Sequence, residues 1–144
     1  MEVHRQLGPG FLESIYKNAL LHELSIQGLT VSSELIVPIS YKEKVVGKHR
    51  IDVLVENQVV VELKAASVII PIHAAQIISY LKATSIPVGL LINFGENSLV
   101  WKRLVLSAKS ALNATINPPN PRNPRNPRLS YFARGSALIV RGWV

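Results

Sequence analysis

The chain has 144 residues, of which 48% are hydrophobic, and this size and composition predict one soluble domain with its own core. It contains no cysteine, which excludes disulfides and thiolate metal sites. The net charge of +7 is unevenly distributed: residues 1–96 contain all nine acidic residues and carry a net −1, whereas residues 97–144 contain no acid and carry +8. Basic character therefore belongs to the C-terminal third, and net charge alone is a weak argument for nucleic-acid binding.

No targeting or membrane segment is visible in the sequence. The N-terminus lacks the apolar stretch of a signal peptide, and apolar runs such as residues 88–92 are far shorter than the ~20 residues of a membrane helix. We therefore expect a cytoplasmic protein that does not associate with membranes.

The first predicted element is a helix. The sequence Gly-Pro-Gly at residues 8–10 interrupts the chain, and apolar residues then recur at helical spacing from Phe11 to Ile26. Gly28 is suited to end this helix. Glu13 lies in its first turn, where the helix dipole favours a carboxylate whether or not that carboxylate has a further role.

Strand patterns dominate the middle of the chain. The predicted strands cover residues 29–39, 45–55, 59–64, 87–94 and 99–106. Pro38 indicates that the first strand lies at a sheet edge or ends there, and the nearly all-apolar fourth strand is typical of a strand buried on both faces.

A second helix is predicted from Pro71 to about residue 83, between the third and fourth strands. His73, Gln76 and Tyr80 fall on one stripe of this helix by their i+3 and i+4 spacing. The order α-β-β-β-α-β-β predicts an α/β fold with a mixed central sheet flanked by helices.

The character of the chain changes after this region, so we assign a domain to residues 1–112 and a tail to residues 113–144. Residues 117–128 repeat Asn-Pro-Arg, which favours an extended polyproline-like chain with Arg122, Arg125 and Arg128 aligned on one side. Two interpretations stay open. The segment is a solvated tail, flexible at least to residue 128, or it is an arm that contacts phosphates.

Three charged residues occupy unusual positions. Asp52, Glu62 and Lys64 are embedded among Val and Leu in two consecutive predicted strands. Burying an ionised side chain costs several kcal/mol unless the charge is paired or holds a metal. The trio therefore predicts either a divalent-metal site or a buried ion-pair network around Lys64.

The metal hypothesis depends on the turn between the two strands. A two-residue turn at residues 57–58 would put Asp52 and Glu62 on opposite faces of the hairpin. A three-residue turn at residues 56–58 instead sets Asp52 across from Glu62, with Lys64 on the same face and opposite Arg50. The metal site thus predicts an odd-length turn.

With that register, two carboxylates and the backbone carbonyl of Leu63 would suit a hard cation such as Mg²⁺ or Mn²⁺. Glu13 could reach the same ion from the first helix. Such an ion polarises a phosphodiester and lowers the pKa of bound water, and Lys64 beside it could offset developing charge.

These residues resemble known motifs. Asp52 followed by Glu62-Leu63-Lys64 resembles the D…(E/D)-x-K signature of the PD-(D/E)XK nuclease superfamily. Residues 10–16 read G-x-x-E-x-x-Y, like the GxxExxY protein family, and residues 3–10 resemble its lead-in. Residues 76–80 resemble the Q-x-x-x-Y motif of the RecB-like branch, and residues 91–95 resemble the following strand. The resemblance covers residues 1–106 and begins inside what looks like the family's first helix, so we expect a segment before Met1.

The resemblance implies a restriction-endonuclease-like core and a nuclease that uses Mg²⁺ or Mn²⁺ on DNA or RNA. The implied metal ligands or their supports are Glu13, Asp52 and Glu62, the implied catalytic lysine is Lys64, and the implied substrate contacts are Gln76 and Tyr80. Two alternatives remain: a catalytically silent nucleic-acid-binding or regulatory module of the same fold, and a metal-free domain with a buried ion network.

Overall fold

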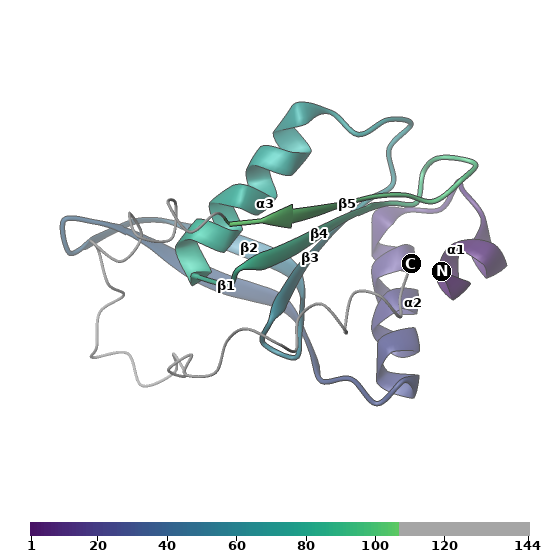
Figure 1. Cartoon of the computed structure of the whole chain (residues 1–144), viewed down its shortest axis with the longest axis horizontal. Coiled ribbons are helices and arrows are strands. Elements are labelled where there is room, and N and C mark those ends of the chain that lie inside the picture. The colour runs from purple at the N-terminus through teal and green to yellow at the C-terminus, as the bar shows by residue number, and fades with distance from the viewer. Residues whose placement is uncertain (107–144) are drawn as a thin grey trace.

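A computed structural model of the chain describes residues 1–106. The elements are α1 (Glu2–Leu7), α2 (Glu13–Ile26), β1 (Val31–Tyr41), β2 (Lys44–Val55), β3 (Val59–Lys64), α3 (Pro71–Thr84), β4 (Val88–Asn93) and β5 (Val100–Val105) (Figure 1). The predicted tail, with Arg122, Arg125 and Arg128, lies outside the described residues. Among residues 1–106, no helix is both long and apolar enough to cross a membrane.

The strands form one mixed sheet in the order β1-β2-β3-β4-β5, which confirms the predicted α/β architecture. The pairs β1–β2, β2–β3 and β4–β5 are antiparallel, whereas β3 and β4 are parallel. The parallel pair requires a crossover, which α3 supplies. Pro38 lies in the edge strand β1, as predicted. Proline has no N–H to donate, and an edge strand tolerates it because only one of its sides pairs with a neighbouring strand.

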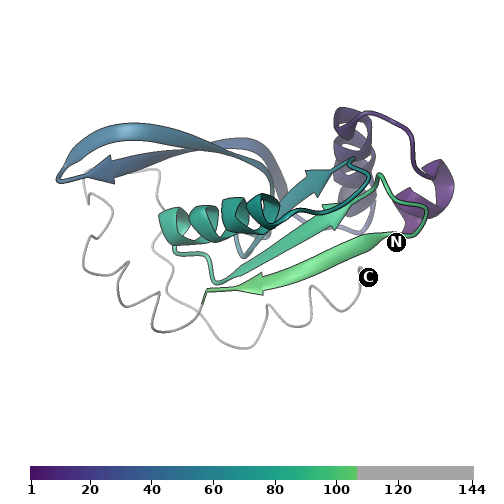
Figure 2. The same cartoon turned by 90° about the horizontal axis from the view of Figure 1, so that it is seen from above.

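Two hydrophobic clusters cover the two faces of the sheet. On one face, α2 packs Tyr16, Leu20 and Leu24 against the odd-numbered residues of β3. On the other face, α3 packs Ile77 and Leu81 against β3 and β4 (Figure 2). All six residues of β4 are buried, which confirms the prediction of a strand covered on both faces.

The helix α1 is a correction to the predicted element order, which began with α2. This helix has only six residues, too few for a clear periodic pattern, and such a short helix is marginal without tertiary contacts. Val3 is buried in the α2-side core, with Met1 and Leu7 packed against it, so tertiary burial stabilises the helix. Gly8 ends it with φ 65°, a conformation that favours glycine.

The strands β1 and β2 extend beyond the rest of the sheet as a two-stranded ribbon, which we define as residues 36–50 (Figures 1 and 2). The strand β3 pairs with β2 only from Val53 to Val55, so no third strand of residues 1–106 pairs with the ribbon. At its base, the β1–β2 pairing is interrupted at Glu34, whose φ of 55° is unusual for a strand residue. The ribbon therefore leaves the sheet at the level of Asp52.

Candidate active site

The turn between β2 and β3 has the predicted odd length. The register pairs Val55 with Val59 and Val53 with Val61, which leaves residues 56–58 as the turn. Extending this register by one pair places Asp52 across from Glu62. The strand register that a shared site requires is therefore confirmed.

Asp52 lies where β2 and β3 separate, a place that we call the fork and that is formed by Asp52 and residues 62–64. The backbone pairing of β2 with β3 ends at Val53 and Val61, and beyond it the N–H of Leu63 donates to Asp52 Oδ2 at 3.2 Å. This carboxylate takes the place of a backbone acceptor and is held in a defined orientation. The predicted pairing of Lys64 with Arg50 does not form, because the strands have separated before reaching them.

Glu62 is almost completely buried, with 1% of its surface exposed. Its Oε1 accepts a hydrogen bond from Lys64 Nζ at 2.6 Å, whereas its Oε2 has no partner among the described residues. Burial raises the pKa of Glu62 to about 7; the contact with Lys64 opposes this shift, and the charge of nearby Asp52 adds to it. Within residues 1–106, this buried carboxylate oxygen is thus left without a hydrogen-bond donor.

Lys64 is the last residue of β3, and its Nζ contacts Glu62 in the fork. Burial lowers the pKa of its ammonium group, but the hydrogen bond to Glu62 and the charges of Glu62, Glu13 and Asp52 outweigh burial, so the pKa is raised. Lys64 therefore stays positively charged through the physiological range.

The position of Glu13 differs from those of the other acids. It is the exposed first residue of α2, and its charge acts on Lys64. Within residues 1–106, however, no three His, Asp or Glu side chains lie close enough together to hold a metal ion. The structure brings Asp52, Glu62 and Lys64 together, and it places Glu13 near Lys64 without completing a three-carboxylate group.

The helix α3 presents two of its predicted polar residues to this fork. Gln76 Nε2 donates to the hydroxyl of Tyr80. Burial raises the pKa of Tyr80, the hydrogen bond with Gln76 opposes this shift, and the negative charges of Glu62 and Asp52 add to it. His73, on the same predicted stripe, has a different role, because its Nδ1 accepts the Ile70 N–H at 3.4 Å and caps the helix.

His49 is a site neighbour without a predicted role. Its Nε2 lies 2.8 Å from Ser79 Oγ, and its ring meets Tyr80 edge-on with centroids 4.9 Å apart. The only sequence signal is that His49 opens the stretch that contains Asp52. Its partners are some thirty positions away in sequence, so only the fold could bring them together.

The chain just after Lys64 is held by β4 and the loop after it. The buried Asn93 accepts the Ala66 N–H on Oδ1 at 3.0 Å and donates from Nδ2 to the Ala66 carbonyl at 2.8 Å. A Cβ added at Gly95 would lie 2.4 Å from the Ala66 oxygen, so the two backbones meet here. Both residues lie in the segment that resembles the family's following strand, which was the available signal for this role.

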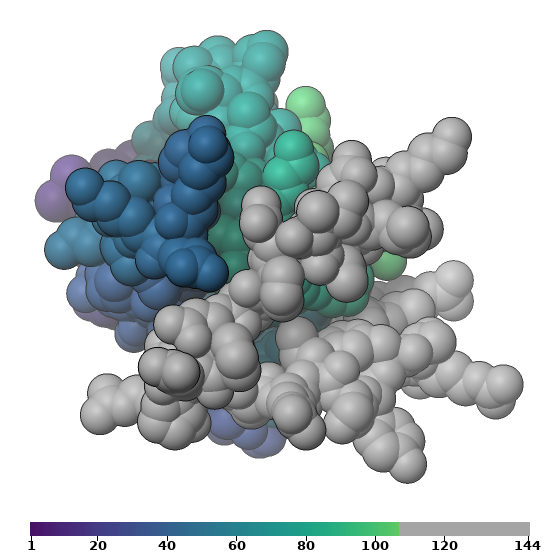
Figure 3. All heavy atoms as spheres, turned by 90° about the vertical axis from the view of Figure 1, so that its left-hand side faces the viewer, coloured from purple at the N-terminus to yellow at the C-terminus, as the bar shows by residue number. Residues whose placement is uncertain are grey.

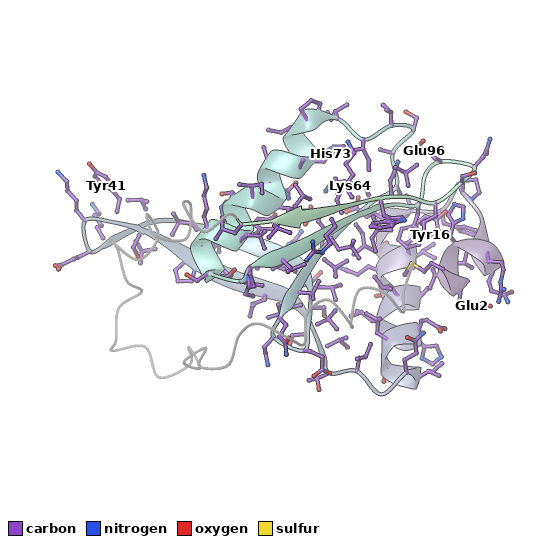
Figure 4. The ribbon with its side chains drawn as sticks, in the orientation of Figure 1. Glu2, Tyr16, Tyr41, Lys64, His73 and Glu96 are labelled. Atoms are coloured by element: carbon purple, nitrogen blue, oxygen red, sulfur yellow. The ribbon has the colours of Figure 1, made fainter. Side chains whose placement is uncertain are left out.

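Tyr16 explains part of the Gly-x-x-Glu-x-x-Tyr sequence. Its side chain is fully buried and stacks on Phe94 at 4.6 Å between ring centroids (Figure 4). Its hydroxyl donates to the Gly8 carbonyl at 2.6 Å and accepts the Phe11 N–H at 3.1 Å. Tyr16 thereby fixes the loop that leads into Glu13.

The chain has a restriction-endonuclease-like α/β fold. Its mixed five-stranded sheet has helices on both faces, and two acids and a lysine meet where two strands separate. A family model described as the PD-(D/E)XK nuclease superfamily matches residues 1–104, and the chain belongs to this superfamily. No curated protein matches the chain.

A similar solved structure is described as "Crystal structure of SSO0001". It has a TM-score of 0.52 and 18% sequence identity over 72% of this chain. The match covers 55% of the SSO0001 chain, so this protein spans about half the length of that relative. At this identity the likeness supports the fold.

Proposed function

We propose that the protein is a metal-dependent nuclease that hydrolyses phosphodiester bonds of DNA or RNA with Mg²⁺ or Mn²⁺. The observation that carries this proposal is the Oε2 of buried Glu62, across the fork from Asp52, which has no hydrogen-bond partner in the described part of the chain. A buried carboxylate oxygen without a donor is costly unless a cation approaches it. The Gly-x-x-Glu-x-x-Tyr sequence at residues 10–16 further supports placing the chain in the GxxExxY branch of the superfamily.

The donor set fits Mg²⁺, which proteins often hold through one or two carboxylates with water and substrate phosphates completing the octahedron. Asp52 and Glu62 would be these ligands. The Leu63 carbonyl is a third candidate, because the N–H and C=O of one strand residue point to the same side and the Leu63 N–H reaches Asp52. Glu13 would act through a water or support Lys64. A bound Mg²⁺ or Mn²⁺ supplies a polarised phosphodiester and a more acidic water.

Charge stabilisation, orientation of a metal ligand and substrate contact would then fall to different residues of the chain. The ammonium group of Lys64, held by Glu62, offsets the negative charge that develops on the phosphate during attack. The Leu63 N–H keeps the Asp52 carboxylate oriented. Gln76 and Tyr80 on α3 would contact the substrate backbone from the other side of the fork.

A cleavage assay tests this proposal on duplex DNA, single-stranded DNA and RNA in Mg²⁺ or Mn²⁺. Asp52→Ala and Lys64→Ala should each lower the rate by at least about a hundredfold, as expected for loss of a charge-stabilising group. Lys82→Ala, which removes an exposed lysine from the end of α3, is the matched control and should leave the rate unchanged. A wild-type protein that cuts none of these substrates, or variants that cut as fast as wild type, would refute the proposal.

A second candidate function is a silent nucleic-acid-binding or regulatory module. It is favoured by the absence of a three-carboxylate group within residues 1–106. It predicts no Mn²⁺-dependent thermal stabilisation, whereas an active site predicts a shift that Asp52→Ala abolishes.

For the tail, we propose that Arg122, Arg125 and Arg128 contact phosphates. Deleting residues 113–144 should then weaken binding and reduce its salt dependence.

A further inference from the structure

The ribbon of residues 36–50 concentrates positive charge away from the acidic fork. It carries Lys42, Lys44, Lys48 and Arg50 against a single acid, Glu43. The ion pairs among the described residues join Arg5 to Glu2, Lys17 to Glu34 and Lys64 to Glu62, and none includes a ribbon cation. The ribbon lysines are therefore exposed cations without an acidic partner in residues 1–106.

The ribbon also exposes apolar side chains that a monomer would normally bury. Ile36 is 52% exposed, and Tyr41, Val45 and Val46 are at least 60% exposed. In Figure 3 the ribbon tip faces the viewer, with α3 above it. Lysines interleaved with exposed apolar residues on a projecting element indicate a contact surface.

The shape of this element fits a DNA groove. A two-stranded antiparallel ribbon is one of the two elements that the major groove of B-form DNA admits. In that position, lysines reach phosphates on the groove walls and apolar side chains meet thymine methyl groups on its floor. The major groove of A-form RNA is too narrow and deep for side chains to read, so this mode of binding distinguishes duplex DNA from duplex RNA.

The ribbon is continuous with the carboxylate pair. Lys44 at its tip and Asp52 at the fork belong to the same strand β2 and are separated by about 26 Å, at ~3.3 Å per residue. At the root, His49 contacts Ser79 and the ring of Tyr80 on α3. A duplex lying on the ribbon would therefore approach the fork along β2.

A second copy of this chain is the competing occupant, because β1 is an edge strand of the sheet that residues 1–106 form. Charge argues against it, since two ribbons that each carry four cations and one acid would repel one another. Along the ribbon the outer edge of β2 is also unpaired within residues 1–106, and it carries Lys44 and Lys48; edge lysines are known to prevent such strand pairing. A polyanion complements the same charges.

We propose that the ribbon binds the major groove of double-stranded DNA and guides the duplex toward Asp52 and Glu62. This inference rests on the proposed nuclease function and assigns that function a substrate, B-form duplex DNA.

The test compares two charge-matched variants of the full chain in EDTA, where cleavage does not interfere. The ribbon variant is Lys42→Gln, Lys44→Gln and Lys48→Gln, and the control variant is Lys82→Gln, Lys102→Gln and Arg103→Gln, all exposed positions. Binding to a labelled DNA duplex of about 20 base pairs, and to an RNA duplex of the same length, is measured by fluorescence anisotropy across a salt series. Thermal melting and light scattering report folding and self-association.

If each ribbon lysine neutralises one phosphate, the ribbon variant should lower the slope of log K against log salt by about 2.7, which corresponds to ~100-fold weaker binding near 0.15 M salt. The control variant should weaken binding by less than about threefold, and wild type should prefer the DNA duplex to the RNA duplex.

Equal effects of the two variants, equal affinity for both duplexes, or no binding of duplex DNA by wild type would overturn the proposal. A ribbon variant that self-associates but binds DNA like wild type would also overturn it, because the lysines would then only protect the edge. If the protein binds duplex DNA through the ribbon but cuts no substrate, ribbon binding is supported and the nuclease proposal is refuted.

Discussion

The buried carboxylate of Glu62 makes a quantitative prediction about stability. Its folded-state pKa is raised from an ordinary value of 4.5 to about 7, because burial disfavours its charge. A group with a raised folded-state pKa stabilises the fold fully below the unfolded pKa, and this contribution is lost as the pH rises through the folded-state value. At about 1.36 kcal/mol per unit, the shift corresponds to roughly 3 kcal/mol.

The measurement is urea unfolding of wild type and Glu62→Gln in EDTA, from about pH 4 to about pH 8. The free energy of unfolding of wild type should fall relative to that of the variant by about 3 kcal/mol across this range, because glutamine does not titrate. Subtracting the two curves cancels the groups that titrate in both proteins. Glu23→Gln removes a half-buried carboxyl of α2 that accepts a hydrogen bond from Gln27; it is the control and should follow wild type.

A divalent ion should offset about half of this loss. Mg²⁺ at about tenfold above its dissociation constant should stabilise wild type by ~1.4 kcal/mol near pH 8, and it should have little effect on Glu62→Gln. Parallel pH profiles for wild type and Glu62→Gln would refute the reasoning, since they would show that the carboxyl is not held in an unfavourable environment.

Two further substitutions test the backbone contact beside the site and the turn at the ribbon tip. Gly95→Ala should lower the free energy of unfolding by about 1–3 kcal/mol and also reduce cleavage, because the added Cβ would clash with the backbone of Ala66. Gly47→Ala is the control and should change neither, because a Cβ there has no atom within 4 Å. Urea unfolding and the cleavage assay check this, and equal stability of the two variants would contradict it. Glu43→Gly should stabilise the fold by about 1 kcal/mol, because Glu43 adopts φ 67° in the ribbon turn, a left-handed conformation that favours glycine. Glu43→Ala keeps the unfavourable Cβ and should show no gain of stability in a thermal melt.

The secondary structure could be predicted well because most elements carry their own local signal. The β3 range of residues 59–64 matches the prediction at both ends, and the predicted second helix is one residue shorter than α3. The short helix α1 was missed, because its stability depends on contacts with the core rather than on its own six residues.

The parity of the site also follows from local information. Side chains alternate along a strand, so a single turn length decides whether Asp52 and Glu62 share a face. The cost of burying charge then predicts that these acids and Lys64 form one constellation. Tertiary structure was needed to show that Glu62 Oε2 lacks a partner among the described residues and that Leu63 donates to Asp52.

The sequence by itself determined the strands and the candidate residues of the fork, because periodicity and burial energetics act over a few residues. It left two turn lengths open between β2 and β3, and the structure has the three-residue turn that sets Asp52 across from Glu62. Only the tertiary structure decided where β1 and β2 leave the sheet, that Asn93 holds the chain after Lys64 and that His49 contacts α3. These contacts join segments 27 to 30 positions apart, and no local pattern of spacing specifies them. They depend on how the two faces of the sheet are packed.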